Sequence, residues 1–148
     1  MGRPPKHPGA ASSSRTGRWQ RPATLLYAGL LLTGSVLPAR GIPQIIDWSG
    51  LFSQDKIAHF GAYAVFAVLL ALCFARQGRR RAVVRGAFLA AAFGALMEVL
   101  QAVAGTGRSA DPVDMVANLI GALLGGLLAF VAWKMLPTPP ATVRGDQY

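Results

Sequence analysis

Four long apolar stretches, separated by segments that hold most of the charged residues, constrain what this chain can fold into. They run over residues 23–38, 57–75, 82–104 and 113–136. At about 1.5 Å per residue, each of the last three is long enough for a helix that crosses a hydrocarbon core of about 30 Å. The first is a little short unless its helix begins earlier, near Trp19. None alternates with a period of two, which excludes barrel strands. We therefore predict an all-α membrane protein, a bundle of four transmembrane helices.

The first apolar stretch also has features of a signal peptide, because basic residues precede it. A cleavage site after Ala39 is poorly formed, since the bulky Leu37 stands where a small residue is needed and Arg40 follows. These features favour an uncleaved helix.

The two ends of the chain lack the apolar residues that a packed structure needs. We predict that residues 1–21 form a disordered basic tail and that residues 137–148 form a flexible tail. Residues 22–136 then form the four-helix transmembrane domain.

The distribution of cations predicts the orientation in the membrane. The chain has 15 Lys and Arg against 6 Asp and Glu, a net charge of +9. With the N-terminus in the cytoplasm, twelve cations lie inside and three outside, namely Arg40, Lys56 and Arg108. This indicates a multi-pass protein of the cytoplasmic (inner) membrane with both termini cytoplasmic. Topology thus explains the basic charge, and without a groove-reading motif we expect no nucleic-acid partner.

Polar residues gather at the outer ends of the last three stretches, where five of the six acids lie at or beyond the outer leaflet. At 100° per residue, polar and small residues share one face of each helix. The face of the second stretch contains Asp55, His59, Ala62, Tyr63 and Phe66. That of the third contains Ala87, Ala91, Gly94, Glu98 and Gln101, and that of the fourth contains Asp114, Asn118, Gly121, Gly125 and Ala132. Close backbone approach drives helix packing in lipid. We therefore predict that the faces meet, with Gly94, Gly121 and Gly125 as packing positions.

Some of these polar residues have a purely structural interpretation. The run Asp111-Pro112-Val113-Asp114 is typical of a helix start, with Asp111 as N-cap and Asp114 in the first turn. Ser53 can cap the second helix in the same way. Glu98 is harder to explain as a purely structural residue, because placing an ionisable side chain inside the membrane costs free energy. Its candidate partners are Lys56, His59 and Arg108.

Three blocks carry a family resemblance: residues 55–63 (DKIAHFGAY), 98–101 (EVLQ) and 107–118 (GRSADPVDMVAN), followed by Gly121 and Gly125. In order and spacing they resemble the VanZ-like family of small multi-pass bacterial membrane proteins. The resemblance implies a four-helix membrane domain and an association with the cell envelope and with teicoplanin resistance, but no reaction. It assigns a functional polar cluster to Asp55, Lys56, His59, Tyr63, Glu98, Gln101, Arg108, Asp111, Asp114 and Asn118.

Three classes of function fit this pattern. The leading hypothesis is a non-enzymatic membrane protein whose outer cluster binds an envelope component, such as an anionic lipid or a peptidoglycan precursor, and influences teicoplanin susceptibility. The second is an envelope hydrolase or transferase acting on a lipid-linked substrate, with acid–base groups or metal ligands among His59, Glu98, Asp111 and Asp114. The third is a small transporter or accessory subunit.

The enzyme hypothesis has no reactive motif behind it. HExxH and GxSxG are both missing, and the single cysteine, Cys73, lies at the far end of its helix from the cluster. No Cys/His zinc spacing occurs either. We therefore predict no metal and no cofactor, and the lipid bilayer as a partner; the oligomeric state does not follow from the sequence.

Overall fold

The computed structural model describes residues 16–36, 54–104 and 111–136, apart from the side chains of residues 16–18, 54 and 55. These ranges form four helices, α1 (Thr16–Val36), α2 (Gln54–Cys73), α3 (Arg79–Val103) and α4 (Pro112–Met135), with a short 3-10 turn, Ala75–Gln77, between α2 and α3. The described residues contain no strand. Helices α2, α3 and α4 are long and apolar enough to cross a membrane. The predicted all-α membrane bundle is confirmed.

Helix α1 begins earlier than the predicted domain boundary. Residues 16–21 were expected to belong to a disordered tail, yet they form its first turns. Arginine and glutamine are good helix formers, and the Thr24 hydroxyl donates to the Gln20 carbonyl, 2.8 Å away, across the turn that contains Pro22. The 21 residues of α1 extend over roughly 30 Å. The predicted tails over residues 1–15 and 137–148 lie outside the described residues.

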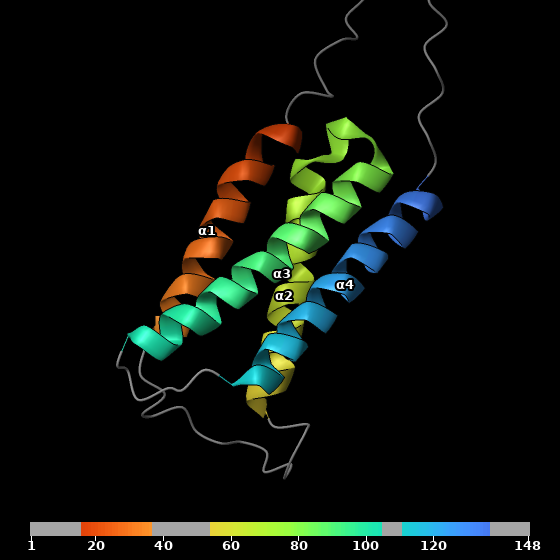
Figure 1. The fold of residues 1–148 in the computed structure, drawn as a ribbon. Helices are drawn as coiled ribbons and strands as arrows, with labels where there is room; N and C mark the ends of the chain where they lie inside the picture. The colour runs from red at the N-terminus through yellow and green to blue at the C-terminus, as the bar shows by residue number, and fades with distance from the viewer. Residues whose placement is uncertain (1–15, 37–53, 105–110, 137–148) are drawn as a thin grey trace, which may run out of the picture.

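Neighbouring helices in the sequence run in opposite directions (Figure 1). Helices α2, α3 and α4 form a core in which each contacts the other two, and α1 packs on α2 and α3. The Tyr27 hydroxyl of α1 donates to the Ala62 carbonyl of α2, 3.1 Å away. The starts of α2 and α4 and the end of α3 consequently meet at one end of the bundle, called the polar end below. The start of α1 and the end of α4 lie at the other.

The closest helix contact in the core joins the parallel helices α2 and α4. A Cβ atom on Gly121 would collide with the Phe60 carbonyl oxygen, and one on Gly125 with the Ala64 carbonyl oxygen. The two glycines are four residues apart on α4, and their partners are four residues apart on α2. The two rows of residues therefore run alongside each other. Gly94 of α3 lies at a similar contact, where a Cβ would be 2.9 Å from the Asn118 Cβ. All three predicted packing glycines therefore lie where helices touch.

Two details of the predicted packing faces differ in the structure. Ala132 is exposed, and Ala129 is buried in its place, because the contact follows the residues four apart that continue from Gly121 and Gly125. The faces also omitted Gly86 of α3, where a Cβ would lie 2.7 Å from the Ala71 backbone nitrogen. Small residues four apart, Ala82, Gly86, Ala90 and Gly94, do mark this row in the sequence, but the predicted face followed Ala87 and Ala91 instead.

Many interior positions hold small side chains, beside the buried Tyr63, Phe66 and Met97, while many large apolar side chains point outward. Ala67, Ala71, Ala90 and Ala122 are fully buried. Exposed residues include Phe88, Leu123 and Leu127. This distribution suits a hydrocarbon solvent, in which large apolar side chains gain nothing by turning inward and backbones approach through small residues.

Candidate functional site

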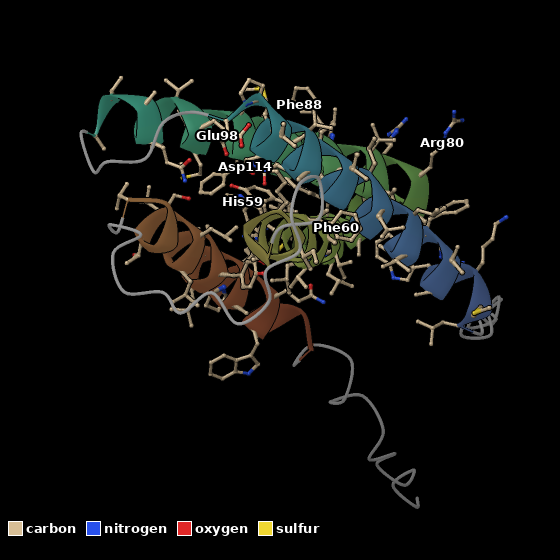
Figure 2. All side chains as sticks on the ribbon, turned by 90° about the horizontal axis from the view of Figure 1, so that it is seen from below. His59, Phe60, Arg80, Phe88, Glu98 and Asp114 are labelled. Carbon is tan, nitrogen blue, oxygen red and sulfur yellow. The ribbon has the colours of Figure 1, made fainter. Side chains whose placement is uncertain are left out.

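The polar end of the bundle collects side chains from all three core helices. Figure 2 views this end and shows His59 of α2, Glu98 of α3 and Asp114 of α4 pointing toward one another between the helices. The other members with described side chains are Lys56, Tyr63, Gln101, Asp111 and Asn118. The structure thus brings together eight of the ten sequence-predicted site residues. The side chain of Asp55 and the whole of Arg108 lie outside the described part of the chain.

The start of α4 has the predicted capping arrangement. Asp111 is the N-cap, and its Oδ1 accepts from the Val113 N–H at 2.8 Å; Pro112 follows and Asp114 lies in the first turn. The prediction of this helix start is confirmed. The other carboxyl oxygen of Asp111 faces Lys56. The Val113 N–H and the Lys56 ammonium together hold the pKa of the Asp111 carboxyl below its ordinary value.

Lys56 joins the first turn of α2 to the first turn of α4. Its Nζ lies 3.1 Å from Asp111 Oδ2 and 3.4 Å from Asp114 Oδ1. Lys56 was a candidate partner for Glu98, but within the described residues it pairs with the two aspartates. The reason is the parallel packing of α2 and α4, which sets Lys56 against the start of α4. Ser53, the predicted cap of α2, lies outside the described residues.

Glu98 is the most deeply buried carboxylate of the site, with 1% of its surface exposed. It accepts hydrogen bonds from the Asp111 backbone N–H and from Asn118 Nδ2, both at 3.4 Å. The Asn118 Oδ1 lies 3.1 Å from His59 Nδ1. Because the amide gives its NH₂ to a carboxylate, its oxygen faces the ring and accepts from the His59 N–H. Asn118, itself 1% exposed, therefore links α3 to α2 through one side chain.

Three side chains with metal-ligating atoms meet at the centre of the site. A ring nitrogen of His59 and a carboxylate oxygen from each of Glu98 and Asp114 lie within 4.8 Å of one another. One imidazole and two carboxylates can serve as acid–base groups or as ligands of a divalent ion. The sequence placed these residues on facing helix surfaces but could not show how close their side-chain atoms come.

Two buried polar groups of the site have no hydrogen-bond partner among the described residues: the Tyr63 hydroxyl and Gln101 Nε2. Tyr63 is 2% exposed and Gln101 3%. The ring of Tyr63 reaches the contact between Gly94 and Asn118, where its Cε1 would lie 3.1 Å from a Cβ on Gly94. Buried polar groups are nearly always satisfied, so these are two places within the described residues where a further hydrogen-bond partner is expected.

An apolar groove beside Lys56 was not predicted from the sequence. It lies between α2 and α4, has a volume of about 470 Å³, and every other lining residue is apolar, among them Ile57, Phe60, Val116 and Ile120. The spacing of these residues at three or four positions would have indicated one apolar surface per helix. Only the register of α2 against α4 makes the two surfaces adjoin at Lys56.

Three packed apolar spans with a buried polar cluster at one end define a multi-pass helical membrane protein with a site at the end of its bundle. The chain belongs to the VanZ/LLP1 family, whose family profile matches residues 9–133. The resemblance read from the sequence blocks is therefore confirmed. No curated protein and no solved structure matches the chain.

Proposed function

We propose that the protein binds an amphiphilic component of the cell envelope, with an anionic head and an apolar chain, at the polar end of its bundle. An anionic lipid or a lipid-linked peptidoglycan precursor has this chemistry. The observation that carries the proposal is the position of Lys56, which forms the polar end of the apolar groove and also faces the polar cluster.

The groove suits the apolar chain of such a molecule. Its walls come from α2 and α4, both of which are long and apolar enough to span the bilayer. A lipid chain can enter it from the membrane without crossing a polar surface. The groove between α3 and α4, lined by Val84, Phe88, Leu123 and others, has no charged residue in its lining. Of these two grooves, the one between α2 and α4 combines an apolar wall with a cation.

The head group would meet a mixed environment of donors and acceptors. The Lys56 ammonium and the N-terminus of α4 favour an anion. The carboxylates of Asp111 and Asp114 beside Lys56 disfavour a bare, multiply charged one. A head group that also offers hydroxyl or amide donors satisfies both, as the sugar or peptide of an envelope precursor does.

The proposed function needs the polar end to face outward, and the distribution of cations favours that orientation. With both termini in the cytoplasm, the polar end faces outward in the inner membrane, and Arg79, Arg80, Arg81 and Arg85 lie at the inner end. Periplasm-dependent reporters fused after Arg80 and after Lys134 should be inactive, and one fused after Ser49 should be active. An active fusion at Arg80 would contradict this topology.

Retention of envelope lipids tests the binding function directly. Native mass spectrometry of the detergent-purified protein should detect a co-purified anionic amphiphile on the wild-type chain and markedly less on Lys56→Gln. Arg80→Gln removes the same charge at the other end of the bundle and is the matched control. Equal retention by all three proteins would overturn the proposal.

The family resemblance adds a cellular phenotype. We expect production of the protein to lower the teicoplanin susceptibility of a sensitive host, because a protein that holds a lipid-linked precursor competes with the drug for it. Lys56→Gln should lose this effect at equal expression. If Lys56→Gln still lowered teicoplanin susceptibility, the phenotype would not depend on this site.

A further inference from the structure

We propose that His59, Glu98 and Asp114 bind a divalent transition-metal ion, Zn²⁺ by preference, at the centre of the polar end. The proposal goes beyond the binding of an amphiphile by Lys56 and the apolar groove. The sequence named these residues as metal ligands only within the enzyme hypothesis and otherwise predicted no metal, because ligands from three different helices form no zinc spacing.

The donor set and its spacing fit such an ion. The three ligand atoms lie within 4.8 Å of one another. A tetrahedral zinc site, with bonds of about 2.0–2.2 Å, needs ligand atoms roughly 3.4 Å apart. The terminal torsions of Glu and Asp are broad, so the carboxylates can turn to close this difference. One imidazole among oxygen ligands favours zinc-like ions over Mg²⁺ and Ca²⁺, which prefer oxygen alone.

The contacts of the two carboxylates leave ligand atoms available on Asp114 and Glu98. Asp114 uses Oδ1 toward Lys56, which leaves Oδ2 for an ion. The two hydrogen bonds to Glu98 are long, at 3.4 Å each. Asn118 contacts both His59 and Glu98 and so orients two of the three side chains at once. Outer partners of this kind typically hold metal ligands in place.

The charge of the site calls for a cation. Among the described residues, the carboxylates of Glu98, Asp111 and Asp114 share one lysine ammonium, that of Lys56. Glu98 and Asp114 are both buried, and like charges in a buried place repel strongly. A divalent ion balances the two negative charges that remain among these described groups, because an imidazole binds a metal in its neutral form.

An independent observation points to a ligand at the same place. The Tyr63 hydroxyl, on a side chain 2% exposed, has no hydrogen-bond partner within the described residues. Side chains on a helix lean toward its N-terminus, so Tyr63 leans toward His59, one turn earlier on α2. Its ring edge lies beside Asn118, the residue that holds two of the proposed ligands. A water or ligand oxygen on the fourth position of the ion would give this hydroxyl its partner.

Titration of the full-length, chelator-treated protein in detergent with Zn²⁺ alone tests the site. The wild type should bind one Zn²⁺ per chain, measured by isothermal titration calorimetry. His59→Gln, Glu98→Gln and Asp114→Asn should each weaken binding at least tenfold. Asp111→Asn removes a carboxylate at the same end but outside the trio and is the matched control. Equal weakening by Asp111→Asn would show diffuse attraction by acidic groups and overturn the proposal.

A second measurement needs no variant. Co²⁺ added to the wild-type protein should give the intense visible absorption of a four-coordinate ion, and Zn²⁺ should abolish it. If the wild type shows neither this band nor stoichiometric Zn²⁺ binding, the metal site does not exist. Lipid retention by the wild type against Lys56→Gln is measured separately, so either proposal can fail while the other stands.

Discussion

Two contacts within the α2–α3–α4 core are made by different means. Away from the polar end, Gly86 lies against the backbone of α2 at Ala67 and Ala71, and contact is between backbones. At the polar end, Glu98, Asn118 and His59 add side-chain links between the helices. The first contact packs α3 on α2 and involves no ionisable group. The second places ionisable groups in a buried position, which is costly in a membrane and points to function.

The largest effect should come from disturbing the backbone contact between α2 and α4. Gly121→Leu and Gly125→Leu each force a side chain into a carbonyl oxygen of α2. We expect losses of about 3 kcal/mol or more in stability, the upper end of overpacking costs, since backbone cannot turn away. Thermal unfolding in detergent should show a large drop in the midpoint. Leu127→Ile, on the exposed face, should be nearly silent, and equal effects on the two faces would contradict the packing.

A smaller loss is expected from Gly86→Ala. The added Cβ would lie 2.7 Å from the Ala71 nitrogen, and α3 must shift away from α2. The expected cost is about 1–3 kcal/mol. Gly61→Ala is the control, because nothing lies within 4 Å of a Cβ there, and alanine favours the helix. A Gly86→Ala protein as stable as wild type would mean that this contact of α3 with α2 is loosely packed.

At the polar end, Glu98→Gln should separate function from stability. Glutamine keeps the size, but its single oxygen can accept from only one of the Asp111 N–H and Asn118 Nδ2, which bond different oxygens of Glu98. Because both bonds are long, we expect a stability loss of about 1 kcal/mol, the low end of the cost of one unpaired buried donor. Ligand retention and Zn²⁺ binding should nevertheless be lost. Adding His59→Ala should lower them little further, because residues that act on one ligand are not additive. Full activity in a normally expressed Glu98→Gln protein would refute a functional role of this carboxylate.

The smallest effect concerns acid pH. The pKa of Asp111 is lowered in the folded protein, first by the Val113 N–H and then by Lys56. Its ionised form therefore contributes stability above its ordinary pKa of about 4, and this contribution is lost as the pH falls through the lowered value. The unfolding midpoint of wild type should fall more between pH 6 and about pH 3 than that of Asp111→Asn, which keeps the cap. Identical pH profiles would show that the ion pair contributes nothing.

The sequence predicted well what depends on local pattern. The bounds of α2, α3 and α4 follow from the lengths of the apolar stretches, because a bilayer sets the length of each span. The cap at Asp111 follows from the residues next to it. The start of α1 was predicted too late, because arginines that continue a helix look the same in sequence as arginines in a tail.

By itself, then, the sequence determined the class of protein, its helices, and most of the polar and small residues that face the interior. Those properties depend on the helical repeat and on the surrounding lipid, and both can be read from the type and position of single residues. Only the tertiary structure decided that Lys56 pairs with Asp111 and Asp114 rather than Glu98, that an apolar groove ends at Lys56, and that His59, Glu98 and Asp114 meet within 4.8 Å. These features depend on the register between helices distant in sequence. That register is set where Gly121 and Gly125 lie against α2, a contact that no single helix contains.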